Sequence, residues 1–325
     1  AAIGRVNLFA DDAGFTFLEK VNEFEHTPWE SWMKEGVFLG GGNNLGEQNA
    51  IGDAFRFMTG IFSRPPFGGK SHYFQKDDSG IFIDPSTASY HDEISSGVGM
   101  VHFFGHSTSN VFDISLRTPS EYNNFDRPVF MIAMGCYGGD FTGNSLSFGE
   151  RWLTESRRGA IGYLANSSAG YLRPLKEYGK IMYGYLYEDM VSQPIGDILR
   201  ETVNIYADSF PATINRNHAR QVNLQGDPAL RLFYPEFPDL EVTESGVSFT
   251  PENFSAQDDS FRINIKMGNY GLVTPDSFAL TVVQRLPTGE TIRHDTLLSP
   301  VVIFEDTVSI VLQNKVGNAM TGQNT

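Results

Sequence analysis

The chain has 325 residues, of which 40% are apolar and 13% aromatic, so it can bury substantial cores and is not intrinsically disordered. Its 39 acidic residues outnumber 24 Lys and Arg, and the formal charge of −15 would repel phosphate backbones, which argues against nucleic acid as a partner. A single cysteine excludes an intramolecular disulfide and a multi-cysteine zinc site, and no apolar run approaches the roughly 20 residues that span a bilayer.

The first part of the chain alternates helix-like and strand-like stretches, which is typical of a parallel sheet covered by helices. Apolar side chains at helical spacing predict a helix over 13–26 and another around 51–58, with a short strand at 37–39 between them. The glycines at 40–42 follow that strand, but Leu45 and Asn43 occupy positions where a G-x-G-x-x-G motif needs glycine. We therefore expect a tight turn there and no dinucleotide site.

Two apolar runs end in residues that carry chemistry. The run VGMVHFFGHS leads into His106, and VFMIAMGCYGGDF leads into Cys136, the only cysteine. Parallel strands direct their carboxyl ends to one edge of a sheet, so a thiol and an imidazole placed there would lie side by side as a catalytic dyad. The alternative is a buried structural cysteine with an unrelated histidine.

The next segment continues the same pattern. Ser147 and Glu150 have the spacing of a capping box at a helix start. A third apolar strand over 159–165 enters the polar loop 166–168, a long helix is expected over 172–190, and Pro194 suits the first residue of the next helix. The stretch LQGDPALRLF predicts a turn with a closing strand.

The pattern changes at the proline-rich and acidic stretch YPEFPDLEV, which we interpret as a linker. The sequence thus predicts an α/β domain over 1–237 and an all-β domain over 238–325. Alternating strands after Glu241 favour an immunoglobulin-like sandwich, which we expect to be truncated because no closing strand follows NAMTGQNT.

Other chemistry fits the sequence less well. No G-x-S-x-G elbow is present for a serine hydrolase. His102, His106 and Asp113 could be considered as metal ligands, but strand geometry would spread them apart, and His102 is expected to be buried in the sheet. The acidic pairs 11–12 and 258–259 are typical of solvated loops, with structural calcium as the alternative.

With both strand ends in view, residues 1–235 resemble the gingipain-like cysteine peptidases, in the clan that also holds caspases and legumains. The matching segments follow in chain order. They are I-G-R-V at 3–6, K-V-x-E-F-E at 20–25, W-x-K at 32–34, G-H at 105–106, C-x-x-G-x-F at 136–141, S-x-G-E at 147–150, G-A-I at 159–161 and L-x-G-D-P-A-L at 224–230.

The resemblance implies a caspase-like fold and a cysteine endopeptidase with His106 and Cys136 as catalytic residues. It also implies that the backbone N–H groups of Ser107 and Cys136 bind the oxyanion. We expect a substrate pocket lined by Tyr137, Asp140, Asn166, Ser167 and Ser168, in which Asp140 would suit a basic substrate residue. The chemistry needs no cofactor.

Two departures from the family pattern bear on function. The family usually has glycine after the catalytic histidine, where this chain has Ser107, and its catalytic region usually follows a longer N-terminal part, so we expect a fragment. The resemblance also implies a bacterial protein, secreted or held at the outer surface through the type IX system. Two alternatives to a general endopeptidase stay open: a sortase-like processor of C-terminal sorting signals, and a catalytically degenerate surface binding protein.

Overall fold

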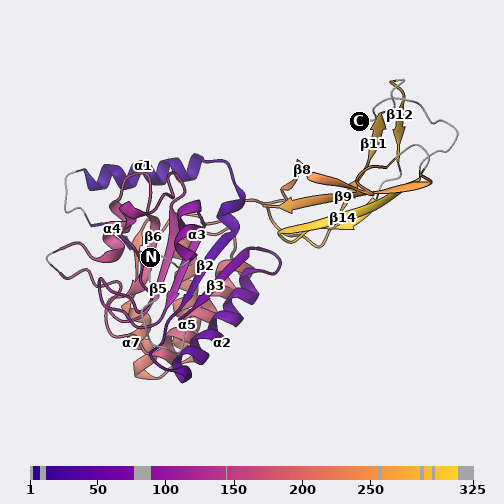
Figure 1. Ribbon diagram of the computed structural model, residues 1–325. Helices are drawn as coiled ribbons and strands as arrows, with labels where there is room; N and C mark the ends of the chain where they lie inside the picture. The colour runs from indigo at the N-terminus through magenta and orange to yellow at the C-terminus, as the bar shows by residue number, and fades with distance from the viewer. Residues whose placement is uncertain are drawn as a thin grey trace. The chain divides into compact units, whose positions relative to one another are not determined.

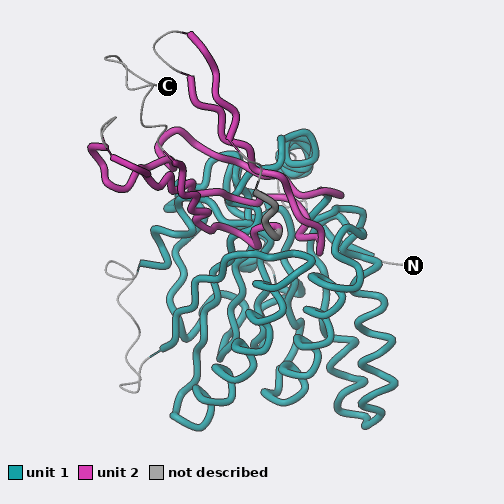
Figure 2. The backbone as a smooth tube through the Cα atoms, turned by 90° about the vertical axis from the view of Figure 1, so that its right-hand side faces the viewer, with its two compact units in different colours: residues 1–234 teal, residues 235–325 magenta. Residues whose placement is uncertain are grey.

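The computed structural model describes residues 3–7, 12–76, 89–143, 145–254, 258–285, 289–294 and 297–313. The chain divides into two units, residues 1–234 and 235–325, which Figure 2 colours separately. The sequence placed the change of character between residues 237 and 238, within the linker.

A mostly parallel sheet forms the centre of the first unit, and in the described part of the chain it has seven strands. Its spatial order is β1-β7-β6-β5-β4-β2-β3. The bounds are β1 (Gly4–Arg5), β2 (Glu35–Gly40), β3 (Lys70–Gln75), β4 (Met100–Phe104), β5 (Val129–Met134), β6 (Ala160–Asn166) and β7 (Val222–Gly226). Strands β4, β5 and β6 are buried at every position, because helices cover both faces and apolar runs are needed on each.

Helices form a layer on each side of this sheet (Figure 1). Neighbouring residues of β3 show the division, because Tyr73 contacts Phe55 of one helix while Phe74 contacts Tyr90 of another on the opposite face. One layer contains α1 (Ala13–His26), α3 (Tyr90–Ser96) and α4 (Phe148–Thr154). The other contains α2 (Leu45–Phe62), α5 (Leu172–Gly184), α6 (Ile195–Ser209) and α7 (Thr213–Gln221). This confirms the predicted α/β class.

Most predicted elements of this unit are confirmed, and the differences have physical reasons. The long helix expected over 172–190 ends as α5 at Gly184 and continues as a π-helical turn over Tyr185–Asp189. The closing strand β7 lies before the G-D-P turn, with no strand over 227–234. Gly226 has φ 135°, and the Asp227 carboxylate accepts from the Ala229 N–H, so the backbone turns away there. Strand β7 also runs antiparallel to β6.

The predicted capping box at the start of α4 is confirmed, and it has a wider role. Glu150 is 2% exposed and accepts from the Ser147 N–H and Oγ, from Asn7 and from Arg5, whose Nη1 lies 2.9 Å away. Burial by itself would raise the pKa of Glu150, but these hydrogen bonds outweigh it and hold that pKa below the usual 4.5. The carboxylate thus joins α4 to the segment around β1.

Replacing Glu150 by alanine is expected to lower the free energy of unfolding by about 2–3 kcal/mol, because buried partners of a charged group lose their acceptor. Since the folded pKa is depressed, the contribution is present above pH 4.5 and is lost as pH falls through the lowered pKa. Urea unfolding at several pH values measures both effects. The control Asp197→Asn removes an exposed pair with Arg200 and should change stability little; an equal effect of the two variants would contradict this assignment.

The second unit is built from antiparallel strands. Strands β8 (Leu240–Thr250), β9 (Ser260–Asn269) and β14 (Glu305–Gln313) form one sheet in the order β14-β9-β8. Strand β10 (Ser277–Leu280) pairs with β13 (Leu297–Pro300), and β11 (Val283–Arg285) pairs with β12 (Thr291–Arg293). Alternate residues of β9, from Phe261 to Met267, enter the core of this unit as the sequence pattern predicted. The immunoglobulin-like assignment of this β unit stays a prediction.

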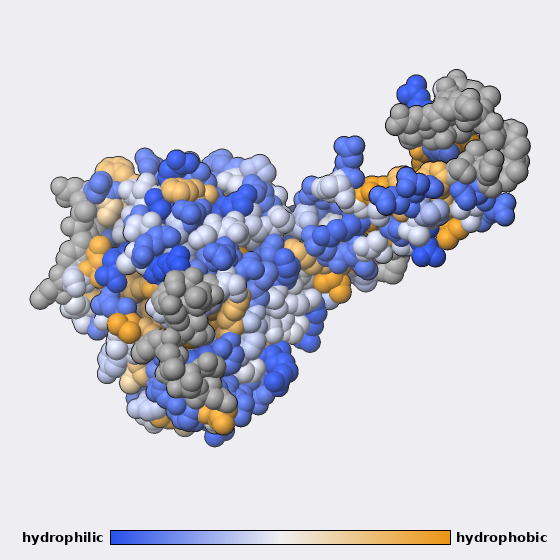
Figure 3. All heavy atoms as spheres, viewed as in Figure 1, coloured by the Kyte–Doolittle hydropathy of each residue, from blue (hydrophilic) through white to orange (hydrophobic). Residues whose placement is uncertain are grey.

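The surface is largely polar on the face shown in Figure 3, where apolar residues occur in small separate groups. Among the helices that the structure describes, none has the length and apolar character needed to cross a bilayer.

Candidate active site

His106 and Cys136 follow the carboxyl ends of two adjacent parallel strands. Phe104, the last residue of β4, is paired with Met134, the last residue of β5, and the Gly105 N–H extends the ladder by donating to the Met134 carbonyl at 3.0 Å. Each candidate residue therefore lies two positions beyond a matched pair. Local sequence explains the strands, since both are continuous apolar runs in the middle of the sheet.

A carboxylate on a neighbouring helix holds the His106 ring. His106 Nε2 lies 2.8 Å from Glu47 Oε2, in the first turn of α2. This contact uses one ring nitrogen and leaves Nδ1 available to accept a proton. The hydrogen bond from His106, followed by one from the Asn43 N–H, lowers the pKa of Glu47. Sequence analysis did not select Glu47. The available signal was the N-x-x-E spacing from Asn44, whose side chain caps α2 by accepting from the Glu47 N–H.

The Cys136 thiol faces the loop that leads into α5. Its Sγ donates to the Gly170 carbonyl at 3.5 Å, and within the described residues it forms no hydrogen bond with His106. Glycine is needed in this loop, because a Cβ on Gly170 would lie 2.5 Å from the Gly135 carbonyl oxygen. The thiol and the imidazole thus lie at the carboxyl ends of the central strands. Both contact residues near the starts of α2 and α5.

Ser107 connects the two strand ends. Its Oγ donates to the Cys136 carbonyl at 2.8 Å, which ties the histidine loop to the cysteine loop. The backbone N–H groups of Ser107 and Cys136 donate to no group among the residues that the structure describes. If Cys136 is a nucleophile, unused N–H groups beside it are the donors that an oxyanion needs.

The predicted pocket residues lie in two loops that meet beside Cys136. Tyr137 has φ 58°, is 44% exposed, and donates its N–H to the Ser168 carbonyl. The Asp140 carboxylate accepts from the N–H and hydroxyl of Thr142, which fixes its own turn.

The rest of the second loop points elsewhere. Asn166 ends β6 itself, and its side chain is 2% exposed and contacts His218 Nε2 at 2.8 Å. The Ser167 hydroxyl donates to the Gln221 carbonyl. Among the predicted pocket residues, Tyr137 is the one with a strongly exposed large side chain.

The alternative metal set of His102, His106 and Asp113 is not assembled. His102 is fully buried, as predicted, with its Nδ1 2.8 Å from the Tyr183 hydroxyl. Of the acidic pairs considered for calcium, Asp11 lies outside the described residues. The pair 258–259 belongs to no group of three possible ligands in the described part of the chain.

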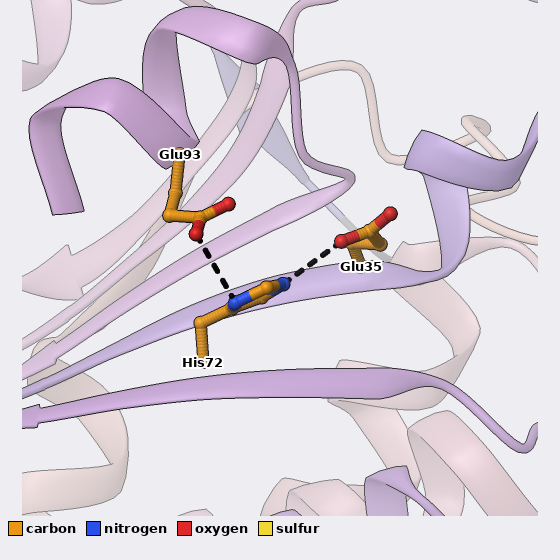
Figure 4. Close-up of side chains that lie close together, drawn as sticks. All are labelled: Glu35, His72 and Glu93. Atoms are coloured by element: carbon orange, nitrogen blue, oxygen red, sulfur yellow. Dashed lines mark hydrogen bonds and ion pairs between the residues drawn. The ribbon is translucent and has the colours of Figure 1, made fainter. Parts of the chain in front are cut away.

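Glu35, His72 and Glu93 do form such a group, with ligand atoms within 4.8 Å of one another (Figure 4). This cluster is near the amino ends of β2 and β3, away from Cys136. Both ring nitrogens of His72 face carboxylates, at 2.8 Å from Glu35 and 3.5 Å from Glu93, and Lys70 Nζ lies 3.0 Å from Glu35. Lys70 and His72 already pair with the two glutamates. We therefore interpret the cluster as an ion-pair network that joins α3 to the sheet.

The contact between Glu47 and His106 makes a testable prediction. Glu47→Gln should lower kcat/KM roughly ten- to a hundred-fold, because an uncharged amide no longer selects the ring orientation that leaves Nδ1 free. The carboxylate is lost only as pH falls through its lowered pKa, so the wild-type advantage should persist at pH 4.5 and disappear at lower pH. Asp53→Asn, an exposed change on the same helix, is the control for pH profiles of peptide hydrolysis. Equal rates for Glu47→Gln and wild type at pH 7 would remove Glu47 from the site.

Comparisons with known proteins identify the family and the fold. The model of a family described as peptidase family C25 matches residues 1–233. The solved structure of the Arg-specific cysteine proteinase gingipain R is 13% identical, with 97% of this chain and 68% of that chain covered and a TM-score of 0.58. A complex of the pro- and mature domains of Porphyromonas gingivalis RgpB is 14% identical, covering 97% and 70%, with a TM-score of 0.60.

A third structure, described as a protease, is 12% identical, covers 91% of this chain and 74% of its own, and has a TM-score of 0.61. No curated protein is similar enough in sequence to count as a match.

Proposed function

The chain belongs to peptidase family C25 and is a cysteine-type peptidase, and we propose that it cleaves polypeptides with a dyad of Cys136 and His106. The observation that carries this proposal is the position of the only cysteine and of His106 at the carboxyl ends of adjacent parallel strands. Both residues lie inside the matched range, which supports their assignment.

The proposed reaction uses groups of the chain alone. Cys136 Sγ attacks the carbonyl carbon of the scissile peptide bond while its proton passes to His106 Nδ1. The imidazolium then gives this proton to the leaving amine, and a thioester with Cys136 remains. Water, deprotonated by His106, attacks the thioester carbon and breaks the bond to Cys136 Sγ; the new carboxyl end is released and the proton returns from His106 to the thiolate. Glu47 accepts from Nε2 and stabilises the imidazolium during both steps.

Backbone groups stabilise the negative charge in this proposal. The N–H groups of Ser107 and Cys136 would donate to the oxyanion, and such a donor is typically worth about 3–4 kcal/mol of barrier. The Ser107 hydroxyl supports the arrangement because its bond to the Cys136 carbonyl limits the separation of the two loops. Serine in place of the usual glycine is thus compatible with activity.

The cellular setting is a proposal from the resemblance. We infer export by the type IX system to the outside or the outer surface of a bacterial cell, with the β unit as an immunoglobulin-like accessory. Polypeptides are the expected partners, while the negative net charge disfavours nucleic acid. The proposed chemistry requires no cofactor, and a calcium ion would have a structural role.

A sortase-like transfer would pass through the same thioester and differ only in the acceptor. The test is therefore to incubate the full chain with a fluorogenic peptide, with and without an added amine, and to identify the products by mass spectrometry. We expect a free carboxyl product in both samples. An amine adduct as the main product would favour transfer, and a folded protein without turnover or thiol labelling would favour a degenerate binding protein.

A further inference from the structure

The thiol and the imidazole each contact a residue next to the start of a helix in the same layer. His106 contacts Glu47 in the first turn of α2, and Cys136 contacts Gly170, two residues before α5 begins. Within the described residues these two helices pack against each other on one face of the sheet. A substrate side chain next to the scissile bond would therefore be directed toward these helix ends.

The side chains that precede the dyad and pack between the sheet and these helices are apolar. Phe104 and Met134, each two residues before a dyad member, are 1% and 4% exposed, and Met58 of α2 is fully buried. Gly179 of α5 lies against both methionines, since a Cβ there would be 2.8 Å from Met134 Cε and 3.1 Å from Met58 Sδ. Methionine side chains are flexible and polarisable, so such a layer can adapt to an entering apolar group.

Two exposed tyrosines come directly after Cys136 and after Gly170, whose carbonyl accepts from the thiol. Tyr137 comes directly after Cys136 and is 44% exposed, and Tyr171 comes directly after Gly170 and is 54% exposed. Tyr137 also has a left-handed backbone conformation, which is rare for a bulky residue and concentrates at functional sites. Exposed aromatic side chains beside a nucleophile offer contact area to an apolar substrate residue.

The carboxylates near the starts of α2 and α5 already have partners, and Asp113, in the loop after β4, is buried and lies 3.7 Å from Lys76. In α2, α5 and the described loop after β5, these pairs are Glu47 with His106, Asp53 with Arg56, Glu177 with Lys180, and Asp140 with Thr142. A buried ammonium or guanidinium needs a charged or hydrogen-bonding partner, and these described elements offer no unengaged one.

We propose that the site selects an uncharged apolar side chain at P1, the substrate residue whose carbonyl is attacked. This inference rests on the proposed peptidase function and specifies its substrate class. The alternative is a basic P1 residue, which Asp140 would suit. The methionine layer with Gly179 forms the base of the P1 site, and Tyr137 with Tyr171 forms its rim.

The first test compares peptides that differ only at P1, carrying Arg, Lys, Asp, Ala, Met, Leu or Phe. We expect kcat/KM for Met, Leu or Phe to exceed that for Arg and Lys at least about a hundred-fold, because a charged group would be desolvated without a partner. Equal or faster cleavage after Arg or Lys would overturn the inference while leaving the peptidase proposal intact.

The second test changes the base of the site. Gly179→Ala should move Met134 and reduce kcat/KM for a Phe P1 peptide about tenfold relative to an Ala P1 peptide. Gly184→Ala is the matched control on the same helix, because a Cβ there would meet nothing within 4 Å. Circular dichroism verifies the fold of both variants. An identical P1 profile for folded Gly179→Ala and the control would contradict the proposed base.

The two proposals fail differently. Cleavage of none of the peptides, with no labelling of Cys136 by an electrophile, would overturn the peptidase proposal and this inference together. Cleavage with a basic preference would overturn only the inference.

Discussion

Cys136→Ala is expected to lower peptide cleavage at least about 10⁴-fold while the protein stays folded, because the nucleophile itself is removed. The fold should tolerate the change, since the thiol contributes one long hydrogen bond to Gly170 and the side chain is only partly buried. Hydrolysis of a fluorogenic peptide and the melting temperature are the two measurements.

The interpretation is simple because Cys136 is the only cysteine in the chain. Loss of activity in a folded variant cannot come from a disulfide or from a second thiol. Turnover close to wild type would show that Cys136 is not the nucleophile, and unfolding would assign it a structural role.

His106→Ala is expected to lower kcat/KM by about 10³–10⁴-fold, because it removes the proposed base that takes the thiol proton and returns it to the leaving amine. The double variant with Cys136→Ala should be no slower than Cys136→Ala alone, since residues that act as one unit are strongly non-additive.

His26→Ala provides the control for a general effect of losing imidazole. His26 is exposed at the end of α1, where its ring contacts the Asn22 carbonyl within the same helix. This variant should keep wild-type activity. A loss after His106→Ala no larger than that after His26→Ala would contradict the dyad.

The central strands and the positions of His106 and Cys136 after them could be predicted because each depends on local sequence. Continuous apolar runs fix β4 and β5, and two parallel neighbours place the residues that follow them at one edge. Strand β3 was missed, because K-S-H-Y-F-Q is partly exposed at the sheet edge and has a polar pattern there. The sequence predicts the closing strand after the G-D-P turn, whereas β7 precedes that turn. The strand ends at Gly226 because this residue has a positive φ, which the sequence alone does not reveal.

Glu47 could not be chosen from the sequence for a related reason. It is 59 residues from His106 and occupies a helix start, where glutamate usually serves the helix itself. Only the packing of α2 on the sheet brings the carboxylate to the ring. The sequence leaves the P1 preference open for the same reason: Asp140 would suit a basic residue, but only the structure shows its bonds to Thr142.

The most direct test of the dyad is covalent labelling of the full chain by an electrophilic peptide with an apolar P1 residue, mapped by mass spectrometry. We predict one modified residue, Cys136, with labelling at least about a hundred-fold slower in His106→Ala than in wild type. Labelling of Cys136 at the same rate with and without His106, or no labelling of a folded protein, would contradict the account.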